Sequence, residues 1–244
     1  METRASRDPR FLIIETSGRV GQVALGEGDR LCGVHRLDEA RKHARDLVPM
    51  IAALMTEEHW KPKEIDAVIV SLGPGSYTGL RVGIMSAKTF AFATGAKVIG
   101  VPTFLAIARQ TPAANAAVDV IANAQQRKIY SQSFCRDASG RMRESASLQI
   151  VPVSDWSTAR DSSAPVTGPG LRIYQDKLST ACLPADLWDP QPATLLAIGF
   201  ERFRSGESDD IWAMEPIYLR PSSAEEKKRD MDAAIGTGGQ ADHG

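Results

Sequence analysis

The sequence is poor in several features that mark specialised proteins. It has three cysteines among 244 residues, no long apolar run and no excess of either charge, since its formal net charge is −1. Cys32, Cys135 and Cys182 stand far apart, which excludes a zinc knuckle and a disulfide framework and suits a reducing compartment. The balanced charge argues against a chain that binds nucleic acid without a partner protein. We therefore expect a cytoplasmic globular protein.

The apolar runs are also too short for export or membrane insertion. The first run, residues 11–14, is four residues long, whereas a signal peptide needs roughly 7–15 apolar residues and a membrane helix about 20. We expect no contact with a membrane. Residues 1–10 are polar, and residues 224–244 begin with a charged run and end in Gly, Gln and Asp. Residues 1–10 are predicted to be a frayed, disordered tail, and residues 224–244 are predicted to be a flexible tail that is disordered or forms a short solvated helix.

The histidines and serines form none of the familiar catalytic spacings. His35, His43, His59 and His243 include no H-x-x-x-H or H-E-x-x-H pair, so no helical metal site is encoded. Ser76 lies in G-S-Y-T-G, which differs from the G-x-S-x-G nucleophile elbow of hydrolases. We therefore predict no catalytic residue and no metal ligand.

Strand and helix patterns predict an α/β protein with two similar halves. The predicted strands of the first half are 11–14, 22–25, 31–36, 67–71 and 97–100, and its predicted helices are 44–58, 78–93 and 103–109. The second half opens again with a strand pair, 118–122 and 129–134, and carries a later helix over 193–204. This repetition suggests two lobes with a cleft between them. The predicted parts are a tail over 1–10, an N-terminal lobe over 11–112, a C-terminal lobe over 113–223 and a tail over 224–244.

A glycine-rich loop, S-L-G-P-G-S-Y-T-G-L-R-V-G at residues 71–83, joins a predicted strand to a predicted helix. The backbone N–H groups of such a junction can cradle a phosphate, but glycines also permit a tight turn or very close packing. No Gly-Lys-Ser/Thr closes the loop as in a Walker A motif. Gly73, Gly75 and Gly79 are spaced one residue too widely for a dinucleotide fingerprint. Spacing alone leaves both readings open.

A polar turn, Glu15-Thr16-Ser17-Gly18, ends the first predicted strand. A carboxylate followed by hydroxyls can hold a metal–phosphate group, although an ordinary hairpin turn has the same composition. The candidate nucleotide-binding residues are Glu15, Thr16, Ser17, Gly73, Gly75, Ser76, Thr78 and Gly79.

Several segments, in the same order, carry a family resemblance. They are F-L-I-I-E-T-S-G-R-V-G-Q-V-A-L at 11–25, H-A-R-D-L-V-P-M-I-A-A-L at 43–54, L-G-P-G-S-Y-T-G-L-R-V-G-I-M-S-A-K at 72–88, G-V-P-T at 100–103 and P-I-Y-L-R at 216–220. Together they resemble the TsaB family, the bacterial dimerisation subunits of the machinery that makes threonylcarbamoyladenosine in tRNA. The resemblance covers about 11–226 and implies the actin-like ATPase (ribonuclease H-like) fold with two duplicated lobes.

The resemblance also implies a role and partners. Members of this family are inactive paralogues of the catalytic subunit TsaD, and they pair with it. The ATPase TsaE joins the pair. A chain of this kind is expected to form a homodimer when alone and to meet tRNA only through the complex. The implied function is that of a non-catalytic subunit required for threonylcarbamoyl transfer to the adenosine next to the anticodon.

A comparison with the catalytic paralogue favours this non-catalytic role. The paralogue carries a metal-binding His-x-Glu-Gly-His motif where this chain has T-F-L-A-I, so Thr103 and Ile107 stand at the two histidine positions. Neither side chain can ligate iron or zinc in that way. The turn at 123–128 lacks glycine, so we expect no second phosphate loop opposite 73–79. The chain should have no cofactor of its own and should bind ATP or ADP at most weakly.

The helices 44–58 and 78–93 are predicted to form the docking face for the partner, with the first helix starting near Asp46 because of Pro49. The candidate interface residues are Leu47, Ile51, Leu54, Leu80, Arg81, Gly83, Ile84 and Ala87. A bulky residue at Gly83 is expected to abolish pairing while the fold is kept. The alternative function is a small kinase or ATPase that acts alone through Glu15 and residues 73–79. A peptidase is disfavoured because the sequence has neither the histidine pair nor the triad.

Overall fold

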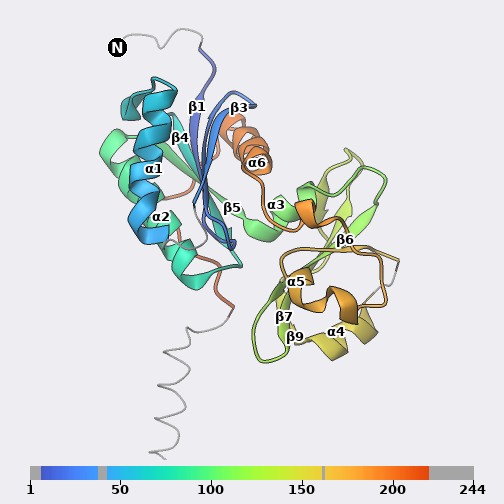
Figure 1. Ribbon diagram of the computed structural model, residues 1–244. Coiled ribbons are helices and arrows are strands. Elements are labelled where there is room, and N and C mark those ends of the chain that lie inside the picture. Colours follow the sequence, from blue (N-terminus) through green and yellow to red (C-terminus); the bar gives the residue numbers. More distant parts are fainter. Residues whose placement is uncertain (1–6, 38–42, 161–162, 220–244) are drawn as a thin grey trace, which may run out of the picture.

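The chain folds into two lobes, each built around its own β-sheet (Figure 1). The computed structural model describes residues 7–37, 43–160 and 163–219. Within these ranges, no helix combines the length and the apolar character needed to cross a bilayer. The predicted tail 224–244 and residues 1–6 of the predicted N-terminal tail lie outside the described residues. Residues 7–10 are instead held in place, because Arg7 pairs with Asp66 at 2.9 Å and the first strand begins at Arg10.

The first sheet has five strands in the order β3-β2-β1-β4-β5. They are β1 (Arg10–Glu15), β2 (Gln22–Glu27), β3 (Arg30–Arg36), β4 (Ala67–Gly73) and β5 (Lys97–Pro102). The first three form an antiparallel meander, and β4 and β5 run parallel to β1. The central strands β1 and β4 are apolar at most positions, as strands that are buried on both faces require.

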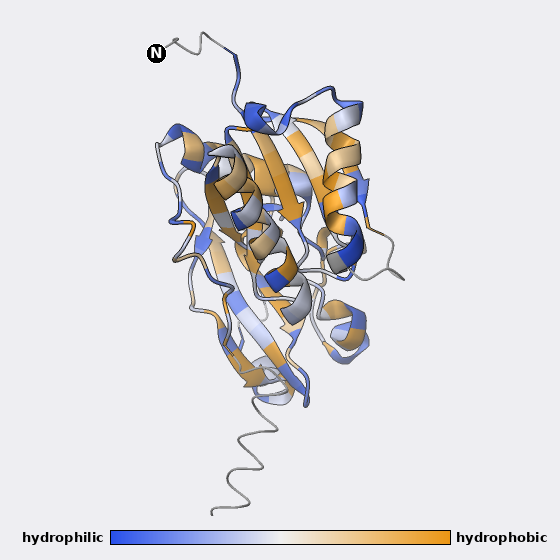
Figure 2. Cartoon of the chain, turned by 90° about the vertical axis from the view of Figure 1, so that its left-hand side faces the viewer, coloured by the Kyte–Doolittle hydropathy of each residue, from blue (hydrophilic) through white to orange (hydrophobic). Residues whose placement is uncertain are grey.

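Helices cover both faces of this sheet (Figure 1). One face carries α1 (His43–Glu57) and α2 (Tyr77–Thr94), and the other carries α3 (Thr103–Arg109) and α6 (Pro192–Arg204). Alternation along β1 divides its side chains between the two layers. Leu12 and Ile14 belong to the core under α1 and α2, whereas Phe11 and Ile13 belong to the core under α6. Figure 2 looks from the side of α1 and α2 and shows the apolar strands behind these helices.

The second sheet repeats this plan on a smaller scale. Its strands are β6 (Ala117–Asn123), β7 (Lys128–Arg136), β8 (Met142–Glu144), β9 (Gln149–Pro152) and β10 (Val166–Thr167). The pair β6 and β7 is antiparallel and β10 runs parallel to β6, as β1, β2 and β4 do in the first sheet. One face packs on α4 (Val153–Ala159) and α5 (Leu171–Tyr174). Three short 3-10 helices are η1 (Pro62–Glu64), η2 (Gln175–Lys177) and η3 (Ala185–Leu187). The repetition agrees with the predicted two-lobed α/β architecture.

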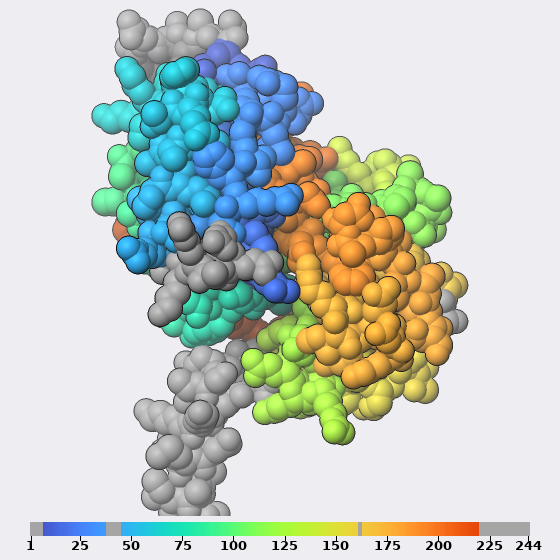
Figure 3. Space-filling view, in the orientation of Figure 1, coloured from blue at the N-terminus to red at the C-terminus, as the bar shows by residue number. Residues whose placement is uncertain are grey.

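The division between the lobes differs from the predicted one at residue 112. The prediction places the later helix in the C-terminal lobe, but α6 packs against β1, β4 and β5 of the first sheet. Gly199 permits this approach, because a Cβ there would lie 2.4 Å from the side chain of Ile69. In Figure 3 the orange α6 lies against the blue first lobe. The chain therefore leaves the first lobe after α3 and returns to it with α6, which no local pattern in the sequence indicates.

After α6, the chain continues in the first lobe as a segment with a turn at 211–213, residues 208–219, which we call the strap. Asp209 bridges to Val98 on β5, and the Ile217 N–H donates to the Leu72 carbonyl at 2.8 Å. The strap thus covers the open edge of β5 at Val98 and ends at the glycine-rich loop. Covering an edge strand in this way prevents its unpaired backbone groups from binding another strand.

The ends of α2 lie close to those predicted. Ser76 caps the first turn by accepting from the Gly79 N–H at 3.2 Å, and Gly95 ends the helix with a φ of 79°. The start of α1 differs, because the helix begins at His43 and so encloses Pro49. Because Pro49 has no N–H group, the carbonyl of Arg45, four residues earlier, receives no helical hydrogen bond. Pro49 is exposed, so this carbonyl lies near water.

Candidate functional site

Two turns that are far apart in the sequence meet at the carboxyl ends of β1 and β4. The first follows β1 and contains Thr16 and Ser17. The second is the glycine-rich loop before α2. The Ser76 N–H donates to the Ser17 carbonyl at 2.8 Å, and the Thr16 hydroxyl donates to the Gly79 carbonyl at 2.8 Å. The structure therefore brings the two groups of predicted site residues together.

The glycines of the loop make this contact possible. A Cβ at Gly75 would lie 2.4 Å from the Ser17 carbonyl oxygen, and a Cβ at Gly79 would lie 2.1 Å from the Thr16 carbonyl oxygen. Real side chains do not approach backbone that closely, so only glycine fits at either position. The sequence left open whether the loop is a phosphate cradle or a site of close packing. Close packing of one turn on the other accounts for Gly75 and Gly79.

Three backbone donors of the loop are committed to the protein itself. The Gly73 N–H donates to the Thr103 hydroxyl at 3.0 Å, and the Ser76 and Gly79 N–H groups donate to Ser17 and Ser76 as described above. A phosphate cradle needs several N–H groups that point at the ligand. The part of the loop that remains exposed is residues 75–78, at the first turn of α2.

Glu15 is the carboxylate of this site, and it is turned into the protein. It is 1 % exposed, and its Oε1 accepts from the Ser17 N–H, the Ser17 hydroxyl and the Gly18 N–H at 2.6, 2.6 and 3.2 Å. Burial raises the pKa of Glu15, and the hydrogen bonds that Ser17 donates oppose that rise in part. Burial is the largest effect, so the neutral acid is favoured relative to an ordinary glutamate.

Glu15 lies in a buried polar row across three neighbouring strands. It pairs with Gln22 on β2, and the register of β1 with β4 places it beside Ser71. Within the described residues, Glu15 Oε2, Gln22 Oε1 and Ser71 Oγ are all buried without a hydrogen bond of normal geometry. When Glu15 is ionised, Oε2 and Gln22 Oε1 can only accept hydrogen bonds, and the Ser71 hydroxyl is the single donor among the three atoms. A proton on Oε2 supplies the donor that the row lacks.

The predicted nucleotide-binding residues therefore divide into two groups. Glu15, Thr16, Ser17, Gly73 and Gly79 are buried in the contact between the turns, whereas Gly75, Ser76 and Thr78 are exposed. The exposed group offers one hydroxyl-rich helix start. Weak binding of ATP or ADP here stays a prediction.

The two positions that correspond to metal-ligating histidines face inward. Thr103 is 3 % exposed, and its hydroxyl accepts from the Gly73 N–H. Ile107 is fully buried in an apolar cluster with Phe104 and Phe134. These two side chains therefore build the core and do not fit a metal site. Among the described residues, no group of three or more His, Cys, Asp and Glu side chains could hold a metal ion.

The predicted interface residues need a correction. Leu47, Ile51, Leu54, Leu80, Gly83, Ile84 and Ala87 are all buried within the first lobe, and only Arg81 is exposed. The periodic apolar stripe of each helix is the side that packs on its own sheet. The expected effect of a bulky residue at Gly83 is wrong for the same reason. A Cβ there would lie 2.1 Å from Thr16 Oγ1, so the change disturbs the lobe itself.

A different face of α2 is apolar and exposed. Tyr77, Met85 and Phe92 are 37, 59 and 71 % exposed, and they lie on one side of the helix with Arg81. We call these four residues the α2 stripe. The sequence places apolar residues on nearly every side of α2, so the exposed apolar side is present in the pattern. The pattern does not indicate which side packs on the sheet.

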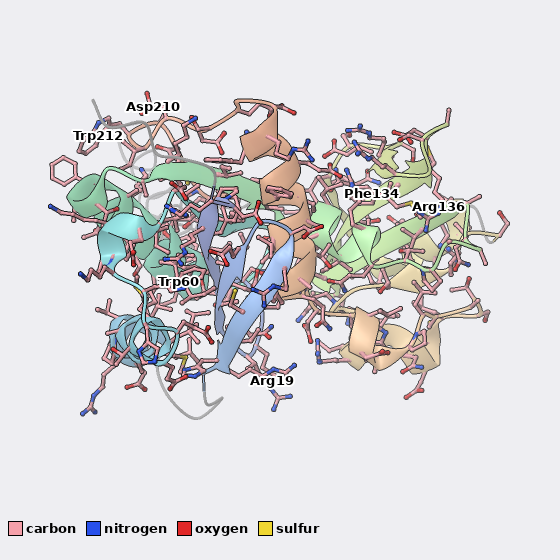
Figure 4. The ribbon with its side chains drawn as sticks, turned by 90° about the horizontal axis from the view of Figure 1, so that it is seen from above. Arg19, Trp60, Phe134, Arg136, Asp210 and Trp212 are labelled. Carbon is pink, nitrogen blue, oxygen red and sulfur yellow. The ribbon has the colours of Figure 1, made fainter. Side chains whose placement is uncertain are left out.

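The strap extends the α2 stripe with two aromatic rings. Trp212 is 74 % exposed and lies edge to face with Phe92, at 5.8 Å between ring centroids. Tyr218 stacks on Tyr77 at 4.9 Å. Figure 4 shows Trp212 at the outer margin of the first lobe, pointing away from the sheet. Among the residues that the structure describes, six of the nine exposed large apolar side chains belong to the α2 stripe or the strap: Tyr77, Met85, Phe92, Trp212, Tyr218 and Leu219.

Comparisons with known proteins agree with the fold and with the family resemblance. The TsaD family, described as tRNA N6-adenosine threonylcarbamoyltransferase, matches residues 7–161. The tRNA threonylcarbamoyladenosine biosynthesis protein TsaB of Bacillus subtilis is 25 % identical over 89 % of this chain and 96 % of its own length. The protein of the same name from Escherichia coli is 27 % identical over 89 % of this chain and 97 % of its length.

A solved structure matches the whole architecture. YeaZ from Pseudomonas aeruginosa superimposes with a TM-score of 0.72 at 24 % identity, over 86 % of this chain and 100 % of that one. This match supports the predicted two-lobed fold. Because the family match spans more than half of the chain and TsaB proteins match nearly end to end, the chain belongs to the TsaD family, in its TsaB branch.

Proposed function

We propose that this chain is the non-catalytic partner subunit of a bacterial complex that makes threonylcarbamoyladenosine in tRNA, and that it acts by pairing with a TsaD-like catalytic subunit. The names of its relatives place them in this biosynthesis. The observation that carries the proposal is a pair of facts about one lobe. Thr103 and Ile107 are buried at the two positions that the resemblance matches to metal ligands, while α2 and the strap expose most of the large apolar side chains on the surface of the described residues.

The α2 stripe and the strap have the properties of a protein interface. Large exposed apolar patches on soluble proteins mark sites of association, and aromatic side chains supply most of the binding energy in such sites. The rings are already held in place, because Tyr218 stacks on Tyr77 and the Arg81 guanidinium donates to the Tyr77 hydroxyl at 2.9 Å. Ordered side chains lose less entropy when a partner binds.

The helix pair thus remains the proposed docking face, with different residues. On α1 the exposed large apolar residue, among those that the structure describes, is Val48, at 63 % exposure. A surface formed by two helices and the strap could bury about 800 Å² per partner, which suffices for a specific dimer. In the absence of the partner, the same face would pair with a second copy of this chain. A TsaE-like ATPase would join the complex, and tRNA would bind to the complex in the cytoplasm.

The test is co-purification with the TsaD-like protein of the same organism, followed by a tRNA modification assay with and without this chain. Met85→Glu should abolish pairing and modification, because it puts a charge in the middle of the α2 stripe. Val34→Glu is the matched control, since Val34 is 41 % exposed on β3 and pairs with Ala24, which belongs to the core on the face away from α1 and α2. Full modification without this chain, or unchanged pairing of the Met85 variant, would overturn the proposal.

The alternative, a kinase or ATPase that acts alone, gains no support from the site. The N–H groups of Gly73, Ser76 and Gly79 are bonded within the protein, and Glu15 is buried. Calorimetric titration of the isolated chain with ATP and magnesium separates the two functions. Weak binding without turnover fits the partner subunit, whereas tight binding with turnover supports the enzyme.

A further inference from the structure

The turn between β6 and β7 has an unusual backbone. Gln125, Gln126 and Arg127 have φ values of 62, 49 and 58°, so three consecutive residues with side chains adopt the left-handed conformation. For residues other than glycine, this conformation costs roughly 1–2 kcal/mol each. The sequence shows that the turn lacks glycine but does not reveal that the backbone nevertheless adopts the conformation glycine prefers.

Local hydrogen bonds hold the turn in this shape. The Gln125 N–H donates to the Asn123 side chain at 3.0 Å, and the Lys128 N–H donates to the Gln125 carbonyl at 2.8 Å. The Arg127 carbonyl accepts from the Val153 N–H at 3.1 Å, which ties the turn to the start of α4. A strained and well-anchored turn presents its side chains in a fixed arrangement, and such strain is commonly retained at functional positions.

The side chains that the turn presents are polar or basic. Gln125, Gln126, Arg127 and Lys128 are all exposed, and the turn projects at the lower edge of the second lobe (Figures 1 and 3). Within the described ranges, no ion pair is formed by Arg127 or Lys128. The positive charges at the tip are thus not neutralised by a neighbouring carboxylate of the described chain.

A third cation lies next to the turn. Tyr174 donates from its hydroxyl to the Asn123 side chain at 3.3 Å, and the exposed Lys177 lies 5.7 Å from the centre of the Tyr174 ring. Asp176, also exposed, offsets part of this charge. The edge of the second lobe therefore carries three amides, of Asn123, Gln125 and Gln126, and three cations around one turn.

This surface differs in kind from the docking face. The α2 stripe and the strap are aromatic and suit a protein, whereas the turn has no apolar side chain between positions 125 and 128. Amide and cationic groups on a fixed scaffold suit the phosphates and hydroxyls of a nucleic acid backbone. Two surfaces of different chemistry on different lobes indicate two different partners.

We infer that the 125–128 turn binds the phosphate backbone of the tRNA while the first lobe holds the catalytic subunit. This inference rests on the proposed function, because that function supplies the tRNA. The chain as a whole carries a net charge of −1, so a small number of phosphate contacts would not hold RNA on the isolated chain. The contact adds to RNA binding by the complex and fixes the position of the tRNA on it.

The experiment measures binding of substrate tRNA to the complex of the full chain with its TsaD-like partner, by fluorescence anisotropy across a series of salt concentrations. The test variant is Arg127→Ala with Lys128→Ala. The matched control is Lys61→Ala with Lys63→Ala, which removes the same charge from exposed positions in the first lobe. Formation of the protein complex is measured separately by size-exclusion chromatography.

We expect the test variant to bind tRNA several-fold more weakly and to lower the slope of log affinity against log salt by about 2, one for each lost phosphate contact. The control variant should match the native complex. Unchanged tRNA affinity and slope in an intact complex would overturn this inference and leave the proposed function standing. Weaker pairing of the two proteins in the test variant would show that the turn contacts protein instead. Failure of the native chain to pair would overturn the proposed function itself.

Discussion

Gly79 lies against the backbone of Thr16 so closely that a Cβ at residue 79 would stand 2.1 Å from the Thr16 carbonyl oxygen. The contact joins the first turn of α2 to the turn after β1. Because neither backbone segment can withdraw without losing the hydrogen bond from the Thr16 hydroxyl to the Gly79 carbonyl, the two turns form one structural unit.

Gly79→Ala should therefore destabilise the protein. We expect the free energy of unfolding to fall by about 1–3 kcal/mol, as for other overpacked sites, in urea denaturation followed by circular dichroism. Gly18→Ala is the control in the facing turn, since a Cβ there meets nothing nearer than 3.8 Å. Equal stability of the two variants would contradict the close contact.

The pH dependence of stability should report on Glu15. Its pKa is raised in the folded protein above the ordinary value of 4.5, so the folded state holds a proton that the unfolded state has released. The stabilisation is complete below about pH 4.5 and is lost as the pH rises through the raised pKa. Glu15→Gln keeps a donor toward Gln22 and Ser71 at every pH and should flatten this decline.

Urea denaturation across the range from pH 4.5 to 8 measures this effect. Glu144→Gln, an exposed change on β8, controls for the loss of one negative charge. The same slope of stability against pH in native protein and Glu15→Gln would show that the polar row does not depend on a proton.

The ion pair of Asp119 with Arg160 should be important for the second lobe. The two side chains are 2.9 Å apart, and each is at most 6 % exposed. Removal of one partner leaves a buried charge, so Asp119→Ala should cost about 3–5 kcal/mol. Arg172→Ala, which breaks the half-exposed pair with Asp189, should cost less than about 1 kcal/mol. Thermal unfolding measures the stability of the two variants. Similar unfolding midpoints would contradict the larger contribution of the buried pair.

Gln126→Gly should relieve part of the strain in the 125–128 turn. Since φ is 49° at this residue, we expect a gain of up to about 1 kcal/mol in the free energy of unfolding. Ala138→Gly, at an exposed turn residue without positive φ, should instead lose stability. Calorimetry of the two variants gives the comparison, and a loss at residue 126 would mean that the turn is not strained.

Local patterns predicted the elements of this fold well. The alternating and continuous apolar runs identified β1, β2, β4 and the β6–β7 hairpin, and Gly95 identified the end of α2. These features depend on neighbours in the sequence. The return of α6 to the first sheet depends on the packing of Gly199 on Ile69, 130 residues earlier, and no local pattern encodes it.

The interface prediction was wrong for a related reason. Periodicity identified the more regular apolar side of α2, which includes Leu80, Ile84 and Ala87, and that side is the core side. The exposed side became recognisable only when the strap placed Trp212 and Tyr218 beside Phe92 and Tyr77. Local patterns in the sequence do not indicate that Glu15 lies near the glycine-rich loop, and the family resemblance was needed to expect it.

The strap touches α2 at both ends, through Trp212 at the last turn and Tyr218 at the first. Any fragment that ends after α6 would keep both sheets yet lose half of the aromatic rings on the docking face. Versions that end after α6, and C-terminal fusions that displace the strap, should therefore fold and still fail to pair with the catalytic subunit. An affinity tag for the co-purification experiment belongs at the N-terminus.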